Sequence, residues 1–212
     1  MRVIVSLLPA AAFAAVFLTL QPASFAGKEM KSVLEARSPF DQGARELQIG
    51  LGGFTSVGNY SEVRPHTTDV DASVRLGWML TSPAGEGALR GNLEFLTEIV
   101  GGGVVDGPSG GMAGLSLLLR YNFVQPDAHW VPYFQIGAGA LYNNIHENEP
   151  QRLIGGPFEF NLQAGLGLRY LFSDECAMFV EADYRHISNA CLYDRNAGMN
   201  SVGGWLGVSL FF

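Results

Sequence analysis

Cysteine is scarce in this sequence, and the two cysteines present are too far apart to pair. Cys176 and Cys191 flank a segment whose polar and apolar residues alternate as they do in an extended strand. Fifteen steps of extended chain separate their Cα atoms by up to roughly 50 Å, whereas a disulfide requires less than about 7 Å. We therefore predict two free thiols, although an oxidising compartment would permit a bridge.

Basic residues and metal-ligand clusters are scarce as well. The chain after Ala26 holds all 20 acidic residues but only 12 of the 13 lysines and arginines, which gives it a net charge of −8. An acidic chain of this kind is a poor partner for nucleic acid. Histidine, cysteine and acidic residues are not grouped at the spacing of a metal site. The sequence therefore predicts neither a metal nor another cofactor.

Only one apolar run is long enough to cross a membrane as a helix, and it lies at the start of the chain. Arg2, the apolar run and the small residues Ser24 and Ala26 predict a secretory signal peptide over residues 1–26. An uncleaved membrane helix is the alternative, and the small residues favour cleavage. We expect export, a periplasmic lead-in over residues 27–45 and a folded domain over residues 46–212.

The rest of the chain is dominated by alternation of apolar and polar residues, which predicts strands. The alternation is clearest after Pro157, where Phe158, Phe160, Leu162 and every second residue to Tyr170 are mostly apolar, while the residues between them are polar or glycine. The eight predicted strands cover residues 46–54, 68–80, 91–100, 115–123, 130–142, 158–171, 177–188 and 201–212.

Alternation alone fits a soluble sandwich as well as a membrane barrel, but three features favour the barrel. The predicted strands have about ten residues, which suits a tilted membrane strand. Short connections at 81–87, 124–129 and 172–176 alternate with longer ones around 55–67, 101–114, 143–157 and 189–200. The terminal alternating strand ends at Phe212 and resembles the C-terminal signal of bacterial outer-membrane barrels. We predict an all-β, eight-stranded antiparallel transmembrane β-barrel.

In such a barrel the polar row of each strand faces a small, filled interior, and aromatic residues collect at the membrane interface. A buried ion-pair network explains these inward charges better than a channel or catalytic carboxylates. The expected inward charges are Glu46, Asp71, Arg75, Glu94, Glu98, Arg120, Glu159, Arg169, Glu181, Asp183 and Arg185. The expected aromatic girdle at the periplasmic side is Trp78, Tyr121, Phe123, Trp130, Tyr170 and Phe212.

Two polar residues break the apolar row of the seventh predicted strand. The even-numbered residues from Met178 to Tyr184 face lipid, and the same row continues to His186 and Ser188. Residues i and i+2 lie about 6.6 Å apart on one strand face, so the imidazole can reach the hydroxyl. This is the base–nucleophile pairing of serine hydrolases. The alternative is that both residues only mark the edge of the membrane.

The segments "RHISNA" and "NAGMN", followed by a strand that ends in phenylalanine, resemble the C-terminal signature of PagL-type lipid A 3-O-deacylases. The motif resemblance covers about thirty C-terminal residues. It implies that Ser188 is the nucleophile, that His186 is its general base, and that Asn189 and the backbone N–H of Cys191 bind the oxyanion. It also implies lipid A as the substrate, cleavage of its 3-O-linked acyl chain, and a site facing the outer leaflet of a bacterial outer membrane.

This sequence departs from the family pattern at two of these positions. Cys191 stands where a glycine is usual, and Asn200 stands where a glutamate orients the histidine. The Asn200 amide oxygen can still accept the imidazole N–H but supplies no negative charge. Asp194 is a lower-ranked substitute acid. Two other functions stay open: a catalytically weak or inactive barrel with a structural or adhesive role, and a small pore, which the crowded interior disfavours.

Overall fold

The computed structural model describes residues 38–58, 60–148 and 151–212. The predicted signal peptide over residues 1–26 and residues 27–37 of the expected lead-in lie outside this described part. Within the described residues, no helix has the length and apolar character needed to cross a membrane.

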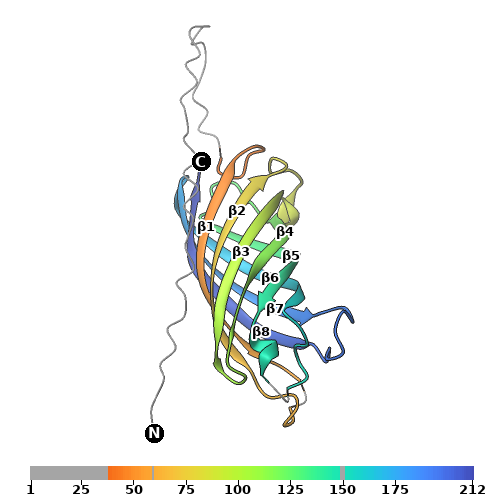
Figure 1. Ribbon diagram of the computed structural model, residues 1–212. Coiled ribbons are helices and arrows are strands. Elements are labelled where there is room, and N and C mark those ends of the chain that lie inside the picture. Colours follow the sequence, from red (N-terminus) through yellow and green to blue (C-terminus); the bar gives the residue numbers. More distant parts are fainter. Residues whose placement is uncertain (1–37, 59, 149–150) are drawn as a thin grey trace, which may run out of the picture. The chain divides into compact units, whose positions relative to one another are not determined.

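Eight antiparallel strands follow one another in chain order and close into a barrel, with β1 pairing both β2 and β8 (Figure 1). The predicted fold class is therefore confirmed. The strands are β1 (Arg45–Ser56), β2 (Thr68–Met79), β3 (Asn92–Asp106), β4 (Gly111–Asn122), β5 (Trp130–Asn143), β6 (Phe158–Ser173), β7 (Cys176–Ser188) and β8 (Met199–Phe211). Two short 3₁₀ turns, η1 (Gly87–Leu89) and η2 (Ile145–Glu147), lie in connections.

One predicted connection is wrong. The segment around 101–114 is mostly strand, because β3 continues to Asp106 and β4 begins at Gly111, which leaves only residues 107–110 as a turn. A run of glycines suggests a loop, but here one of the glycines is needed because the barrel wall leaves no space for a side chain. A Cβ at Gly102 would collide with the Asp71 carboxylate of the neighbouring strand. Gly102 therefore allows the Asp71 side chain to pack closely against β3.

The two ends of the barrel have different connections and are named here by a residue at each. The Phe40 end consists of residues 38–44, 80–91, 123–129 and 174–175. The His186 end consists of residues 57, 58, 60–67, 107–110, 144–148, 151–157 and 189–198. At the His186 end, the connection between β7 and β8 projects sideways from the barrel wall (Figure 1).

Charged side chains fill the middle of the interior, and all eleven predicted inward charges are buried. Arg75 contacts Glu98 at 2.7 Å and Glu181 at 3.0 Å, and Arg169 contacts Glu46 at 2.5 Å and Glu94 at 3.1 Å. The Arg75–Glu98 pair joins the adjacent strands β2 and β3, and the other three pairs join strands that are not neighbours in the barrel. The expected ion-pair network is confirmed.

An apolar cluster closes each end of this charged layer. At the Phe40 end, Phe40 is 1% exposed, stacks edge-on with Phe211 at 5.6 Å between ring centroids, and accepts a hydrogen bond on its carbonyl from Asn92. At the His186 end, Ile145, Leu153, Ile154, Met112, Met199 and other apolar residues form the second cluster. Packed side chains thus occupy the interior from end to end.

The outer wall is apolar and carries aromatic side chains near the Phe40 end. Trp78 stacks on Phe95, Tyr121 contacts Phe123, and Trp130 contacts Tyr170. Large exposed aliphatic residues such as Leu51, Ile99 and Leu166 cover the wall between the two ends. An apolar band with an aromatic border is typical of a barrel that spans a membrane.

Candidate active site

The site lies on the outer wall of the barrel at the His186 end. The register places His186 opposite Leu162 of β6 and Asn200 of β8, and Ser188 opposite Phe160 of β6. His186 and Ser188 are half-buried, while the residues between and beyond them, such as Ile187, are buried in the interior. The alternation of β7 therefore turns both polar side chains to the apolar face, as the sequence predicts.

Hydrogen bonds join three predicted site residues in a chain. The His186 Nε2 atom lies 2.9 Å from the Ser188 hydroxyl oxygen. The His186 Nδ1 atom lies 2.7 Å from Asn200 Oδ1. Because the amide oxygen can only accept, Nδ1 carries the ring hydrogen, and Nε2 is left to accept the proton of Ser188. This is the arrangement of a nucleophile, a base and an orienting group.

Two further residues shape the surroundings of the imidazole. Tyr184, two residues before His186 on the same row, donates its hydroxyl hydrogen to Asn200 Oδ1 over 2.7 Å. Gly198 has φ +72°, and a Cβ there would lie 3.2 Å from His186 Cε1. The missing side chain at Gly198 thus leaves the space that the imidazole ring occupies.

Asn189 does not join the hydrogen-bonded chain of Ser188, His186 and Asn200. Its side chain is buried, and its Nδ2 atom donates to Glu159 Oε1 at 3.3 Å and to the Arg195 carbonyl at 2.9 Å. Its backbone N–H donates to the Asn196 side chain at 2.9 Å. Residue 189 is odd-numbered on an extension of β7, and its side chain therefore turns inward. In this arrangement Asn189 supports the turn after β7, and its expected contact with an oxyanion requires these bonds to break.

Cys191 takes a backbone conformation that suits the glycine usual at this position. Its φ is +67°, that of Ala190 is +50°, and the Leu192 N–H closes the turn on the Asn189 carbonyl at 3.0 Å. The Cys191 N–H donates no hydrogen bond to another described residue. Both Cys191 and Cys176 are free thiols, which confirms the sequence prediction.

Other candidate groups among the described residues do not form a comparable site. Asp194 is exposed, and within the described residues it makes no hydrogen bond to Ser188, His186 or Asn200. Within the described ranges, no cluster of three or more histidine, cysteine or acidic residues could hold a metal ion.

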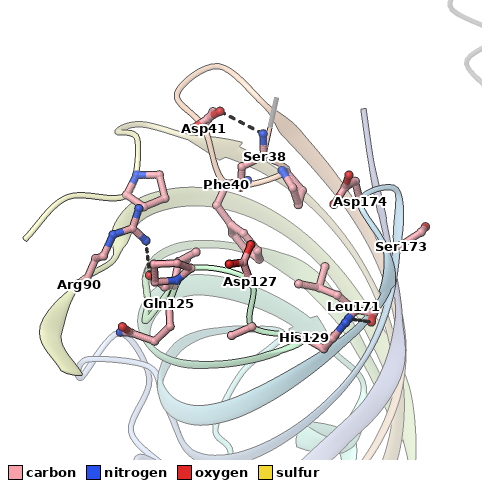
Figure 2. Close-up of a pocket in the computed structure, with 15 residues that line it drawn as sticks. Ser38, Phe40, Asp41, Arg90, Gln125, Asp127, His129, Leu171, Ser173 and Asp174 are labelled. Atoms are coloured by element: carbon pink, nitrogen blue, oxygen red, sulfur yellow. Dashed lines mark hydrogen bonds between the residues drawn. The ribbon is translucent and has the colours of Figure 1, made fainter. Parts of the chain in front are cut away.

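A cavity of about 540 Å³ lies at the Phe40 end, where Figure 2 shows Ser38, Asp41, Asp127 and His129 around the inserted Phe40. Its polar groups serve the turns that line it. The Ser38 N–H donates to Asp41, and His129 Nδ1 lies 3.0 Å from the Leu171 carbonyl. This cavity is not the better candidate for chemistry, because the described residues that line it include no hydrogen-bonded pair of nucleophile and base.

The sequence family described as lipid A 3-O-deacylase (PagL) matches residues 66–209, which is more than half of the chain. The chain belongs to the PagL family. The matched range includes all five predicted site residues. No curated protein is significantly similar to the chain in sequence.

Solved structures of two outer-membrane proteins are similar in fold. The outer membrane enzyme PagL has a TM-score of 0.52 at 17% identity, over 78% of this chain and 98% of that chain. Neisserial surface protein A (NspA) has a TM-score of 0.54 at 13% identity, over 80% of this chain and 98% of that chain. At these identities the likeness concerns the eight-stranded barrel and carries no function by itself.

Tyr184 contacts the site but is not identified by the sequence analysis. Alternation places it on the lipid-facing row with other large side chains, and the sequence does not show the partner of its hydroxyl. The partner becomes visible only with the pairing of His186 to Asn200 and of Tyr184 to Val202. A tyrosine two residues before the histidine, diagonally across from a polar residue on the next strand, is the signal that could have identified it.

Proposed function

We propose that this member of the PagL family is an outer-membrane serine esterase that removes the 3-O-linked acyl chain of lipid A. The observation that carries the proposal is the hydrogen-bonded chain from Ser188 through His186 to Asn200 on the apolar outer wall. A polar group on a lipid-facing row destabilises the barrel in the membrane, and a purely structural barrel would gain nothing from it.

The geometry supports a two-step acyl transfer. The Ser188 oxygen attacks the ester carbonyl carbon while His186 Nε2 takes the hydroxyl proton. As the tetrahedral intermediate collapses, the bond to the sugar oxygen breaks, His186 gives that oxygen the proton so that it leaves as a hydroxyl, and an acyl-Ser188 ester remains. Water, deprotonated by the same nitrogen, then attacks the acyl carbonyl, His186 returns the proton to the Ser188 oxygen, and the fatty acid is released.

The Cys191 N–H is the proposed main donor to the oxyanion. It follows Ser188 at a tight turn and has no partner among the described residues. Asn189 contributes to the oxyanion only if its amide leaves Glu159. Donors of this kind stabilise the negative charge that develops on the carbonyl oxygen, typically by about 3 kcal/mol per donor.

The outer wall next to the site offers a place for an acyl chain. A shallow groove of about 370 Å³ extends from Tyr184 toward the middle of the wall. Its lining includes the small residues Ala164, Ala182 and Gly203 and the large apolar residues Phe134 and Leu166. A lipid whose ester lies at the height of Ser188 can therefore place its chain against the barrel. We place the His186 end at the outer leaflet, where lipid A is found.

A second candidate is a catalytically weak or inactive barrel with a structural or adhesive role. The observation that favours it is Asn200, because an amide cannot neutralise the imidazolium that forms during acylation. Replacement of the triad aspartate by asparagine in a serine protease lowers kcat by about 10⁴ through the wrong histidine tautomer. Here, however, the amide oxygen faces the ring, an orientation that favours the productive tautomer.

Purified protein in detergent, mixed with lipid A, separates the two candidates. We expect wild type to release a hydroxy fatty acid and Ser188→Ala to release none. Ser61→Ala is a matched control, because Ser61 is an exposed serine at the same end of the barrel. Folding is checked by heat modifiability. A well-folded wild-type protein with no release would exclude the esterase and leave the structural role.

A further inference from the structure

Asn200 presents one atom to two hydrogen-bond donors. Its Oδ1 accepts from His186 Nδ1 and from the Tyr184 hydroxyl, each over 2.7 Å. Its Nδ2 donates to none of the described residues. The tyrosine ring is 45% exposed on the outer wall, and its hydroxyl turns back to the site.

The orientation of this amide decides whether His186 can act as a base. With Oδ1 toward the ring, Nδ1 carries the hydrogen and Nε2 accepts from Ser188. With the amide turned over, its NH₂ would donate to Nδ1, and the hydrogen would move to Nε2. That histidine tautomer cannot accept the serine proton. A carboxylate at position 200 would have two equivalent acceptor oxygens and would avoid this ambiguity.

We propose that Tyr184 is a positioning residue that holds the Asn200 amide with its oxygen toward His186. A phenol hydroxyl is a good donor but a weak acceptor, because its lone pair is delocalised into the ring. Its hydrogen bond therefore favours the amide oxygen over the amide nitrogen at the shared position. The role rests on the proposed function for its effect on rate, but its effect on the histidine tautomer does not depend on catalysis.

Tyr184 is distinguished from the other large side chains on the wall by this bond. Tyr142, also at the His186 end, is 59% exposed and packs its ring against Phe158 at 5.3 Å between centroids. It is not hydrogen-bonded to the described site residues. Tyr142→Phe is thus a matched control, because it removes a tyrosine hydroxyl from the outer wall at the same end of the barrel without affecting Asn200.

The tautomer can be measured directly. Full-length barrels in detergent micelles, labelled with ¹⁵N at their histidines, give separate signals for protonated and unprotonated ring nitrogens. His186 is one of 4 histidines, and a His186→Gln spectrum assigns it. We expect the Nδ1–H form in wild type and in Tyr142→Phe, and a shift toward the Nε2–H form in Tyr184→Phe. An unchanged tautomer in Tyr184→Phe overturns the proposal, whether or not the protein is active.

The rate effect should depend on the residue at position 200. We expect Tyr184→Phe to lower kcat about three- to tenfold, the effect of one net hydrogen bond, with KM little changed. In the Asn200→Asp background the same substitution should lower kcat less than twofold, because a carboxylate needs no selection between its atoms. Equal losses in both backgrounds would show a structural or lipid-anchoring role and overturn the proposal.

Discussion

Strand β7 carries polar side chains on both faces, and the two sets are paired in different ways. On the inward face, Arg185 contacts Asp69 and Asp71 of β2 at 2.6 Å each. On the outward face, His186 contacts both Ser188 of its own strand and Asn200 of the adjacent strand. The inward groups neutralise one another across the barrel, so their polarity has a structural reason.

The outward groups have no such reason. The wall around them is apolar, with Phe160 and Leu162 directly opposite on β6. Polar residues on a lipid-facing row are unfavourable, so their presence in a hydrogen-bonded chain supports the proposed catalytic role. On this proposal the inward face of β7 serves stability and the outward face serves catalysis, and substitutions at neighbouring residues can test the division.

The largest expected effect is on catalysis. His186→Ala removes the base, and we expect deacylation to fall about 10³-fold or more, with the barrel still heat-modifiable. The variant leaves the interior untouched, since His186 faces outward. The check is the rate of fatty-acid release from lipid A together with electrophoretic mobility before and after heating. Loss of assembly in this variant would contradict the division between the two faces.

The adjacent residue should behave in the opposite way. Arg185→Ala leaves Asp69 and Asp71 buried without their cation, and we expect a loss of roughly 3–5 kcal/mol in the free energy of unfolding. Denaturant unfolding in detergent measures it. Protein that still folds should retain the hydrogen-bonded chain on the outer wall, and its rate per folded molecule should stay close to that of wild type.

Much of this comparison follows from the sequence, because alternation sets the direction of every side chain in a strand. The alternation predicted the eight strands and the inward direction of the charged residues. It also placed His186 and Ser188 on the outer row. It could not show that β3 continues through Gly102, since glycine has no side chain to reveal a face. It also could not show that Phe40 closes one end or that Asn189 is held by Glu159. Those contacts join segments far apart in the chain.

Asn200 is expected to give an intermediate effect. Asn200→Leu removes the acceptor for the His186 Nδ1–H and should lower the deacylation rate about 10²-fold or more, by analogy with the loss of a triad orienter. Asn200→Asp keeps the size, adds a negative charge, and should maintain or raise the rate. A folded Asn200→Leu protein with the wild-type rate would remove Asn200 from the site and make Asp194 the next candidate.

Gly198 tests the space beside the imidazole. An alanine there would be strained at φ +72° and would place a methyl group 3.2 Å from His186 Cε1. We expect Gly198→Ala to cost about 1 kcal/mol in the free energy of unfolding and to lower the rate severalfold by displacing the ring. Rates and unfolding curves, measured on the same preparation, distinguish this from an effect on assembly alone.

The smallest effect is expected at Cys191. Its φ of +67° suits glycine, so Cys191→Gly should relieve backbone strain while the unfolded chain gains freedom. We expect a change within about 1 kcal/mol in the free energy of unfolding and a rate within twofold of wild type. A large loss of rate would show that the thiol itself contributes to the site and would revise the role given to its backbone N–H.

The most direct test of the account is the mass of lipid A from bacteria that express the protein. With wild type, we predict a new species that is lighter by one hydroxyacyl chain, lost from the 3-position. With Ser188→Ala, expressed and assembled to the same level, lipid A should keep its original mass. Identical lipid A profiles for wild type and Ser188→Ala would contradict the central claim that the polar chain on the outer face of β7 is a catalytic site.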